Sequence, residues 1–281
     1  MAGTDRRRRL LETVRDQFDP AAWAFDSTHE RNGGGVKHAV KTAAFRVGAG
    51  PALRRLRQTV EPAAAKRERR ESEHLHLLLA FTLAADSNCI DVGASVGDTL
   101  EDLVRFAPGG RHIAYEPIPR FAAELAERFP QVDVRNAAVA EAPGETSFVY
   151  VKSRAAYSGL RERDYPGDET IEHITVKVES LDTALPADYV PRLIKIDVEG
   201  AERQVIEGAV GVIARHRPVV IFEHSRGAAE HYDTTPGAIH DLLTGECGLR
   251  IMDLDGGGPY SRGDLERSFA AEERWNYVAR P

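Results

Sequence analysis

NCIDVGASVGD, residues 88–98, is the stretch that decides the fold, because it is typical of a buried strand that runs through a glycine-rich turn into a helix. In α/β proteins such a junction holds a nucleotide against the N-terminus of the helix. Asp91 stands near the end of the predicted strand, and Gly93 and Gly97 let the backbone bend and approach a ligand or the sheet closely. The stretch therefore predicts a ligand-binding turn at residues 91–98.

From Glu73 onward, apolar strands alternate with amphipathic helices, as in a mostly parallel sheet covered by helices on both faces. We therefore predict an α/β domain over residues 73–281. Residues 1–72 are rich in Ala and Arg and are predicted to form a helical or irregular N-terminal extension. The predicted strands are residues 88–92, 112–116, 132–136, 193–197, 219–223, 249–253 and 275–279, and the predicted helices are residues 98–106, 120–128 and 201–216.

Two further segments, residues 146–151 and 173–178, alternate apolar and polar side chains as strands with one solvated side do. They flank a polar loop, residues 153–170. Loops of this length in a compact domain usually serve a function or are disordered. Tyr157 and Ser158 in this loop are candidate substrate-binding residues.

Charge is unevenly distributed along the 281 residues, whose formal net charge is −7. Residues 1–80 carry 16 Lys and Arg against 10 Asp and Glu, whereas the rest of the chain carries 21 against 34. The basic part could meet an anionic partner, but its arginines lack the interleaved aromatic residues on which single-stranded bases stack. We therefore expect no nucleic-acid partner. The sequence leaves open whether the protein forms a homodimer.

The longest apolar run, residues 75–85, is much shorter than the roughly 20 residues that a membrane span requires. Four arginines at residues 6–9 resemble the basic part of an export signal, but acidic residues soon follow them instead of an apolar segment. The two cysteines, Cys89 and Cys247, suit a reducing compartment and have no metal-ligand spacing. We therefore expect a cytoplasmic protein without a membrane span.

A second carboxylate supports a nucleoside site at the glycine turn. Glu116 ends the next predicted strand, 23 positions after Gly93, and Pro117 then turns the chain. An acidic residue at about this spacing holds the ribose hydroxyls in dinucleotide-binding folds. Asp91 stands where dinucleotide-binding turns usually have glycine, and its carboxylate could meet an amino group. A nucleoside that carries an amino acid, S-adenosylmethionine, therefore fits better than a nicotinamide dinucleotide.

The same turn also matches G-x-S-x-G, the nucleophile motif of α/β-hydrolases. Ser95, Asp197 and His224 follow one another in the order of a Ser-Asp-His triad. This interpretation leaves Asp91 and Glu116 without a role, and an acidic residue beside the turn would oppose the oxyanion that such enzymes stabilise. A serine esterase is kept as an alternative hypothesis.

A second group of acidic residues follows two later strands. Asp197 and Glu199 come directly after one predicted strand, and Glu202 lies in the first turn of the following helix, where its charge stabilises the helix dipole. Glu223 and His224 end the next strand. Because ligands of open α/β sheets bind at the carboxyl ends of the strands, we expect these side chains near Asp91 and Glu116.

The motifs together resemble the FkbM family of S-adenosylmethionine-dependent methyltransferases. The resemblance covers residues 88–223 and is carried most specifically by KIDVEGAE at residues 195–202, together with IDVGASVGDT at 90–99, YEPIP at 115–119, NAAV at 136–139 and SLD at 180–182. It implies a Rossmann-like class I methyltransferase fold: a mostly parallel seven-stranded sheet with an antiparallel last strand. It also implies O-methylation of a sugar, polyketide or related metabolite. Residues 1–72 lie outside it.

The resemblance implies that Asp91 and Gly93 meet the methionine end of the cofactor, that Glu116 meets the ribose, and that the segment 136–138 meets the adenine. Ser95 stands where the family often has Asn, which removes an amide from the turn. The cofactor-binding residues implied are Asp91, Gly93, Ala94, Ser95, Gly97, Glu116, Pro117, Asn136, Ala137, Ala138 and Asp197.

The acceptor is expected to be a small molecule or a sugar. Methyl transfer requires alignment of an acceptor oxygen and removal of its proton, and His224, Glu223 and Asp197 are the candidate bases. Glu199 joins the candidate substrate-binding residues. Oxygen ligands at this edge would suit Mg²⁺, but no metal site is predicted. A binding protein that keeps a vestigial cofactor pocket is a second alternative.

Overall fold

The computed structural model describes residues 63–163, 165 and 169–281. The chain divides into two units, Met1–Arg70 and Glu71–Pro281, and the fold described below is that of the second. The first described helix, α4 (Ala63–Thr82), runs across the predicted boundary at residues 72 and 73. Most of the predicted extension lies outside the described residues, so the division into domains 1–72 and 73–281 stays a prediction.

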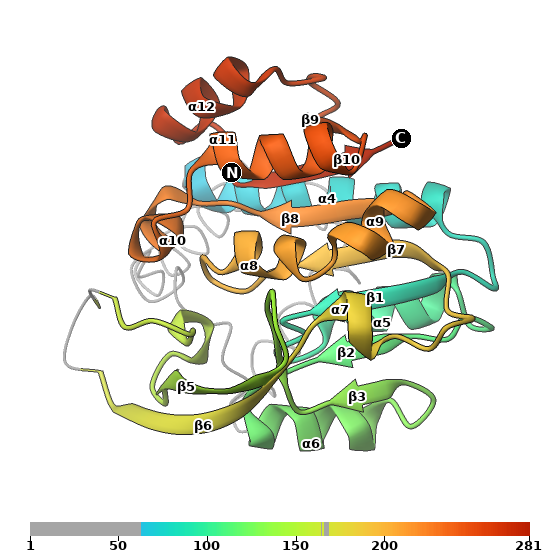
Figure 1. The fold of residues 1–281 in the computed structure, drawn as a ribbon, viewed down its shortest axis with the longest axis vertical. Helices are drawn as coiled ribbons and strands as arrows, with labels where there is room; N and C mark the ends of the chain where they lie inside the picture. Colours follow the sequence, from blue (N-terminus) through green and yellow to red (C-terminus); the bar gives the residue numbers. More distant parts are fainter. Residues whose placement is uncertain (1–62, 164, 166–168) are drawn as a thin grey trace, which may run out of the picture. The chain divides into compact units, whose positions relative to one another are not determined.

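A seven-stranded sheet in the order β3-β2-β1-β7-β8-β10-β9 forms the centre of this unit (Figure 1). Strand β10 runs antiparallel to both of its neighbours, and the other strands run in one direction. The predicted mostly parallel sheet with an antiparallel last strand is therefore confirmed. Its strands are β1 (Asn88–Val92), β2 (Ile113–Tyr115), β3 (Asp133–Arg135), β7 (Pro191–Ile196), β8 (Val219–Glu223), β9 (Arg250–Asp253) and β10 (Asn276–Arg280).

Each face of the sheet is buried by its own set of helices (Figure 1). Because side chains alternate along a strand, Cys89 and Ile221 point to one face and Ile90 and Phe222 to the other. The first face packs on α4, α5 (Asp98–Phe106) and α6 (Pro119–Arg128). The second packs on α7 (Leu181–Ala184), α8 (Glu202–Glu207), α9 (Val210–His216), α11 (Pro236–His240), the π-helix η3 (Asp241–Glu246) and α12 (Arg262–Ala270). The remaining helical turns are η1 (Ala155–Tyr157), α10 (Arg226–Ala229) and η2 (Glu230–Tyr232).

A separate three-stranded sheet, in the order β4-β6-β5, lies beside the main sheet (Figure 1). Its strands are β4 (Ala138–Val139), β5 (Gly144–Val151) and β6 (Ile171–Glu179). The two strands predicted at residues 146–151 and 173–178 are confirmed as the antiparallel pair β5 and β6. The polar loop predicted to be functional joins the ends of this pair.

The single helix predicted at residues 201–216 is wrong, because the segment forms two helices, α8 and α9, that meet at Gly208. Gly208 lies so close to another segment that a Cβ there would stand 2.1 Å from the Ala140 carbonyl oxygen. Its own carbonyl accepts hydrogen bonds from Ser180 and Asp182 instead of continuing the helix. The Asp182 carboxylate then accepts two amides at the start of α9, at 2.9 and 2.7 Å. Among the described helices, none is long and apolar enough to cross a membrane.

Candidate functional site

The carboxyl ends of neighbouring parallel strands bring the predicted acidic residues to one edge of the sheet. Asp91 and Glu116 lie at the ends of β1 and β2, and Asp197 and Glu223 at the ends of β7 and β8. Because these four strands are consecutive in the sheet and parallel, their ends meet in one row. The predicted gathering of these carboxylates at one edge is therefore confirmed.

The turn after β1 is fastened to the strands on both sides of it. The backbone amides of Gly93 and Ala94 both donate to the carbonyl of Tyr115 at 3.0 Å. Gly93 has a φ of +83°, and a Cβ there would stand 1.9 Å from the Asp197 carbonyl oxygen. Glycine is required at position 93 because the turns after β1 and β7 touch there. The sequence pattern did not predict this contact. Gly97 ends the turn immediately before α5.

Glu116 is a buried carboxylate that joins two turns. One of its oxygens accepts the backbone amide of Ser95 and the other accepts that of Ile118, each at 2.8 Å. Burial raises the pKa of Glu116 to about 7, although both amide hydrogen bonds lower it. Since a carboxylate offers about four lone-pair sites, each oxygen can still accept a ligand hydroxyl.

Asn136 comes directly after β3 and is exposed at the same edge. Its amide nitrogen donates to the carbonyls of Glu116 and Pro117, both at 2.9 Å, and so fixes the turn after β2. Ala137 and Ala138 are buried behind it, and Ala138 packs into the small sheet. Of this predicted segment, the Asn136 side chain is therefore the part placed to meet a ligand.

Asp91 is 1% exposed, and its Oδ2 atom has no hydrogen-bond partner. Burial raises the pKa of Asp91 to about 6, with the charge of Lys195 lowering it and that of Asp197 raising it. A buried carboxylate with an unused oxygen is costly unless a cationic or hydrogen-bonding group meets it. The geometry therefore suits a ligand that brings a cation to the end of β1.

Lys195 is a charged residue of this edge that the sequence analysis missed. It lies in the apolar strand β7, is 5% exposed, and donates to Oδ2 of Asp197 at 2.8 Å. Burial lowers the pKa of the Lys195 ammonium, but the neighbouring carboxylates, Asp197 foremost, outweigh burial and raise it. A lone lysine between apolar residues of a central strand is the signal that could have identified it.

Three further carboxylates, those of Asp197, Glu199 and Glu223, lie at this edge and are less deeply buried than that of Asp91. The side chains of Asp197 and Glu199 are 36% and 30% exposed, and Glu223 is half-buried. Burial, followed by the charges of Asp197 and Glu199, raises the pKa of Glu223 well above its ordinary value. A raised pKa means that this carboxylate binds a proton more readily than an ordinary one, as a general base requires.

The polar loop reaches the same edge through Arg163, which donates to Oε2 of Glu199 at 3.0 Å. The guanidinium also lies over the ring of Tyr157, 4.6 Å from its centroid. Burial raises the pKa of Glu199 to about 7, and the charge of Arg163 works against this shift. Ser158 is buried, and its hydroxyl accepts the amide of Val151 at 3.0 Å. Arg163 thus links Tyr157 to Glu199, whereas Ser158 stabilises the loop itself.

His224 lies apart from these carboxylates. Its ring is fully buried and stacks on Phe269 at 4.6 Å, and its Nδ1 atom is 3.9 Å from Oε2 of Glu202. Neither ring nitrogen has a hydrogen-bond partner. Because His224 follows Glu223 directly in an extended segment, the two side chains point to opposite faces of the sheet.

The triad of the esterase hypothesis is not assembled. Ser95 is exposed in its turn, where its backbone amide is bound by Glu116. His224 makes no hydrogen bond through its ring, so it activates no hydroxyl, and Asp197 is paired with Lys195 instead. Within the part of the chain that the structure describes, no three or more His, Cys, Asp or Glu residues are grouped so that they could hold a metal ion.

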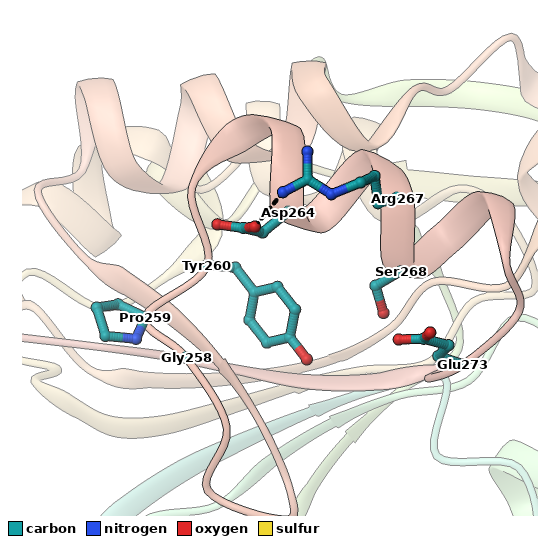
Figure 2. A pocket seen from close by; sticks show the side chains of 7 residues that line it. All are labelled: Gly258, Pro259, Tyr260, Asp264, Arg267, Ser268 and Glu273. Carbon is teal, nitrogen blue, oxygen red and sulfur yellow. Dashed lines mark hydrogen bonds and ion pairs between the residues drawn. The ribbon is translucent and has the colours of Figure 1, made fainter.

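A separate hollow lies beside α12, and none of the predicted site residues lines it (Figure 2). Two of its charged side chains engage each other, since Arg267 pairs with Asp264. The Tyr260 hydroxyl donates to Asp253 at 2.9 Å, and the Ser268 hydroxyl lies 3.2 Å from that of Tyr277. These contacts stabilise the C-terminal segment, and the candidate site remains the edge formed by β2, β1, β7 and β8.

Comparisons with known proteins found one curated sequence and several solved structures that resemble this chain. A segment of 86 residues is 32% identical to the AMB antimetabolite synthetase AmbE of Pseudomonas aeruginosa, and it covers 29% of this chain and 4% of that protein. Among solved structures, the methyltransferase FkbM of Methylobacillus flagellatus is 17% identical with a TM-score of 0.44, over 70% of this chain and 44% of that one. The plantazolicin methyltransferase BpumL in complex with SAH is 10% identical with a TM-score of 0.40, over 80% and 92% of the two chains.

The comparison that identifies the family covers the candidate site. The Methyltransferase FkbM domain matches residues 91–251, which is more than half of the chain. The matched region begins at Asp91 and includes Glu116, Asn136, Asp197 and Glu223, which the sheet brings to one edge. The chain therefore belongs to the FkbM methyltransferase family.

Proposed function

We propose that this protein transfers the methyl group of S-adenosylmethionine to a hydroxyl of a small metabolite, sugar or glycan. The observation that carries the proposal is the row formed by Asp91, Glu116 and Asn136 at the ends of three adjacent strands, inside the region that matches the family. The match to a segment of an antimetabolite synthetase supports a small-molecule acceptor.

The residues present fit the cofactor. The unused Oδ2 atom of Asp91 can meet the ammonium of the methionine end. Glu116 keeps lone pairs for the two ribose hydroxyls, and the exposed Asn136 side chain can meet the adenine. S-adenosylmethionine supplies an electrophilic methyl group carried on a positively charged sulfur.

Glu223 is our candidate for the group that accepts the hydroxyl proton of the acceptor. Its raised pKa strengthens it as a proton acceptor, whereas Asp197 is held by the ammonium of Lys195. Glu199, Arg163 and Tyr157 form the wall of the site on the side of the polar loop, and we propose that they contact the acceptor.

Calorimetry with S-adenosylhomocysteine, the product form of the cofactor, tests the proposal without knowledge of the acceptor. We expect micromolar binding by the wild type and a large loss in Asp91→Asn and Glu116→Ala. A panel of hydroxylated acceptors with methyl-labelled cofactor then tests transfer, with Glu223→Gln as the variant that binds cofactor without turnover. Absence of binding by the folded wild type would refute the proposal, and binding without turnover over a broad panel would favour a binding protein.

A further inference from the structure

Lys195 lies at the centre of the charged groups that face the site. It is the register partner of Asp91 across the β1–β7 pair, so both side chains point to the same face of the sheet. Across the β7–β8 pair it is opposite Ile221, and Glu223 stands two positions further along that strand, on the same face. The Lys195 ammonium on β7 therefore lies between two carboxylates, that of Asp91 on β1 and that of Glu223 on β8.

Asp197 completes the group around the ammonium, because its Oδ2 atom accepts a hydrogen bond from Nζ of Lys195 at 2.8 Å. The four side chains carry three carboxyl groups and one cation. Ammonium and carboxylate are both expensive to bury, and each depends on the other for compensation. A charge change at any member of the group must alter proton binding at the others.

Further charged and polar groups near Glu223 come from the turn after β7, from α8, from β10 and from α4. Glu199 and Glu202, from the turn after β7 and from α8, add negative charge near Glu223. On β10, Asn276 is the register partner of Glu223, and its amide donates to Glu71 of α4 at 2.7 Å. Among the described side chains that act most strongly on Glu223, Lys195 carries positive charge and Asp197, Glu199 and Glu202 carry negative charge.

We propose that Lys195 is a positioning residue of the transfer site, whose ammonium fixes the Asp197 carboxylate and sets the charge state of Asp91 on the cofactor side and of Glu223 on the acceptor side. That Asp91 faces the cofactor and Glu223 faces the acceptor rests on the proposed function. The electrostatic role itself rests on the register and on the hydrogen bond. The lysine keeps Asp91 able to meet a cation and limits the rise of the Glu223 pKa.

Titration of the carboxyl groups by ¹³C NMR tests this role in the unliganded protein. Protein labelled at the glutamate Cδ or aspartate Cγ atoms reports each midpoint, with Glu223→Gln and Asp91→Asn assigning the two signals. In Lys195→Met, which keeps the length of the side chain and removes its charge, we expect both midpoints to rise by about 1–3 pH units. Lys195→Arg should keep them close to the wild type, because the charge is retained.

Two further variants make the result decisive. Lys177→Met removes an exposed strand lysine of β6 and should leave both midpoints unchanged. Asp197→Asn removes a negative charge and should lower the Glu223 midpoint. Unchanged midpoints in folded Lys195→Met would overturn the proposal. If that variant does not fold, the neutral Lys195→Gln takes its place, and unchanged midpoints there would overturn the proposal.

The titration is independent of the proposed function. It requires neither cofactor nor acceptor, whereas failure of the wild type to bind S-adenosylhomocysteine would refute the methyltransferase proposal alone. A lysine that served packing alone would leave the midpoints where they are in Lys195→Met.

Discussion

The backbone amide of Ser95 donates to a carboxylate oxygen of Glu116 at 2.8 Å and so ties the turn after β1 to the end of β2. The second oxygen accepts the amide of Ile118, which precedes α6. A single buried side chain thereby orders the turns at the ends of two adjacent strands. The carboxylate proposed to bind the ribose is thus held in place by the fold before any ligand arrives, which reduces the ordering cost of binding.

Replacement of Glu116 by alanine should weaken binding of S-adenosylhomocysteine by at least about 10- to 100-fold, because the loss of even one hydrogen bond to a charged group costs about 1.5–3 kcal/mol. The carboxylate supplies the acceptors for the ribose hydroxyls and also orders the turn that contains Ser95. Isothermal titration calorimetry at pH 8, above the Glu116 pKa of about 7, measures the loss.

The matched control for this experiment is Glu124→Ala. Glu124 is an exposed carboxylate of α6 that pairs with Arg120 on the surface of that helix. We expect its affinity to stay within about threefold of the wild type, which is within 1 kcal/mol. Equal affinities of Glu116→Ala and the wild type would contradict the ribose site.

The sequence predicted the carboxylates of this edge because strand ends and spacing are local properties. Asp91, Glu116, Asp197 and Glu223 each follow an apolar strand, and parallel strands place such residues in one row. The environment of each carboxylate depends on contacts between distant segments, which the sequence pattern does not contain. For that reason the ammonium of Lys195 beside Asp197 was missed.

The break of the predicted helix at Gly208 has the same origin. The periodicity of residues 201–216 favours one helix, whereas the close approach of the Ala140 carbonyl and the capping by Asp182 divide it. The sequence pattern also did not predict the small sheet formed by β4, β5 and β6. Alternation of apolar and polar residues predicts strands but not the sheet that they join.

The unliganded protein should become less stable as the pH rises from 6.5 to 8. Burial raises the pKa values of Glu116 and Glu199 to about 7, so the folded state binds more protons in this range than the unfolded state, where the ordinary value is 4.5. A raised carboxyl pKa stabilises the fold below the unfolded value, and this stabilisation is lost as the pH passes the folded value. Each such proton contributes a slope of up to about 1.4 kcal/mol per pH unit.

Urea denaturation at pH 6.5, 7, 7.5 and 8 measures this slope. The window begins at 6.5 because burial lowers the pKa of His112 below its ordinary 6.5, which gives a slope of opposite sign at lower pH. Glu116→Gln cannot titrate and should have a shallower slope than the wild type. Identical slopes in the two proteins would show that Glu116 is ionised throughout.

Gly93→Ala should destabilise the fold by at least about 3 kcal/mol, or prevent folding. The new Cβ would stand 1.9 Å from the Asp197 carbonyl oxygen, and the φ of +83° is strained for alanine. Because the obstacle is backbone, no side-chain rotation relieves it. Gly245→Ala is the matched control, since a Cβ there meets nothing within 4 Å. Thermal unfolding that finds both variants equally stable would contradict the contact between the two turns.

His224 provides a prediction that separates packing from chemistry. The buried ring stacks on Phe269 at 4.6 Å, and neither nitrogen has a partner. We expect His224→Ala to lower the free energy of unfolding by about 2–4 kcal/mol through the cavity it leaves. His224→Phe should be at least as stable as the wild type, because it keeps the stacked ring and removes two unsatisfied polar atoms.

His224→Phe also tests whether this residue is the base. Its side chain cannot accept a proton, yet the stacking on Phe269 is retained, so turnover in this variant is not confounded by misfolding. With Glu223 as the base, His224→Phe should bind S-adenosylhomocysteine and transfer methyl at rates within about tenfold of the wild type, whereas Glu223→Gln should lose about 10²- to 10⁴-fold, the usual contribution of a general base. The opposite ranking of the two variants, measured with one acceptor from the panel, would assign the proton to His224.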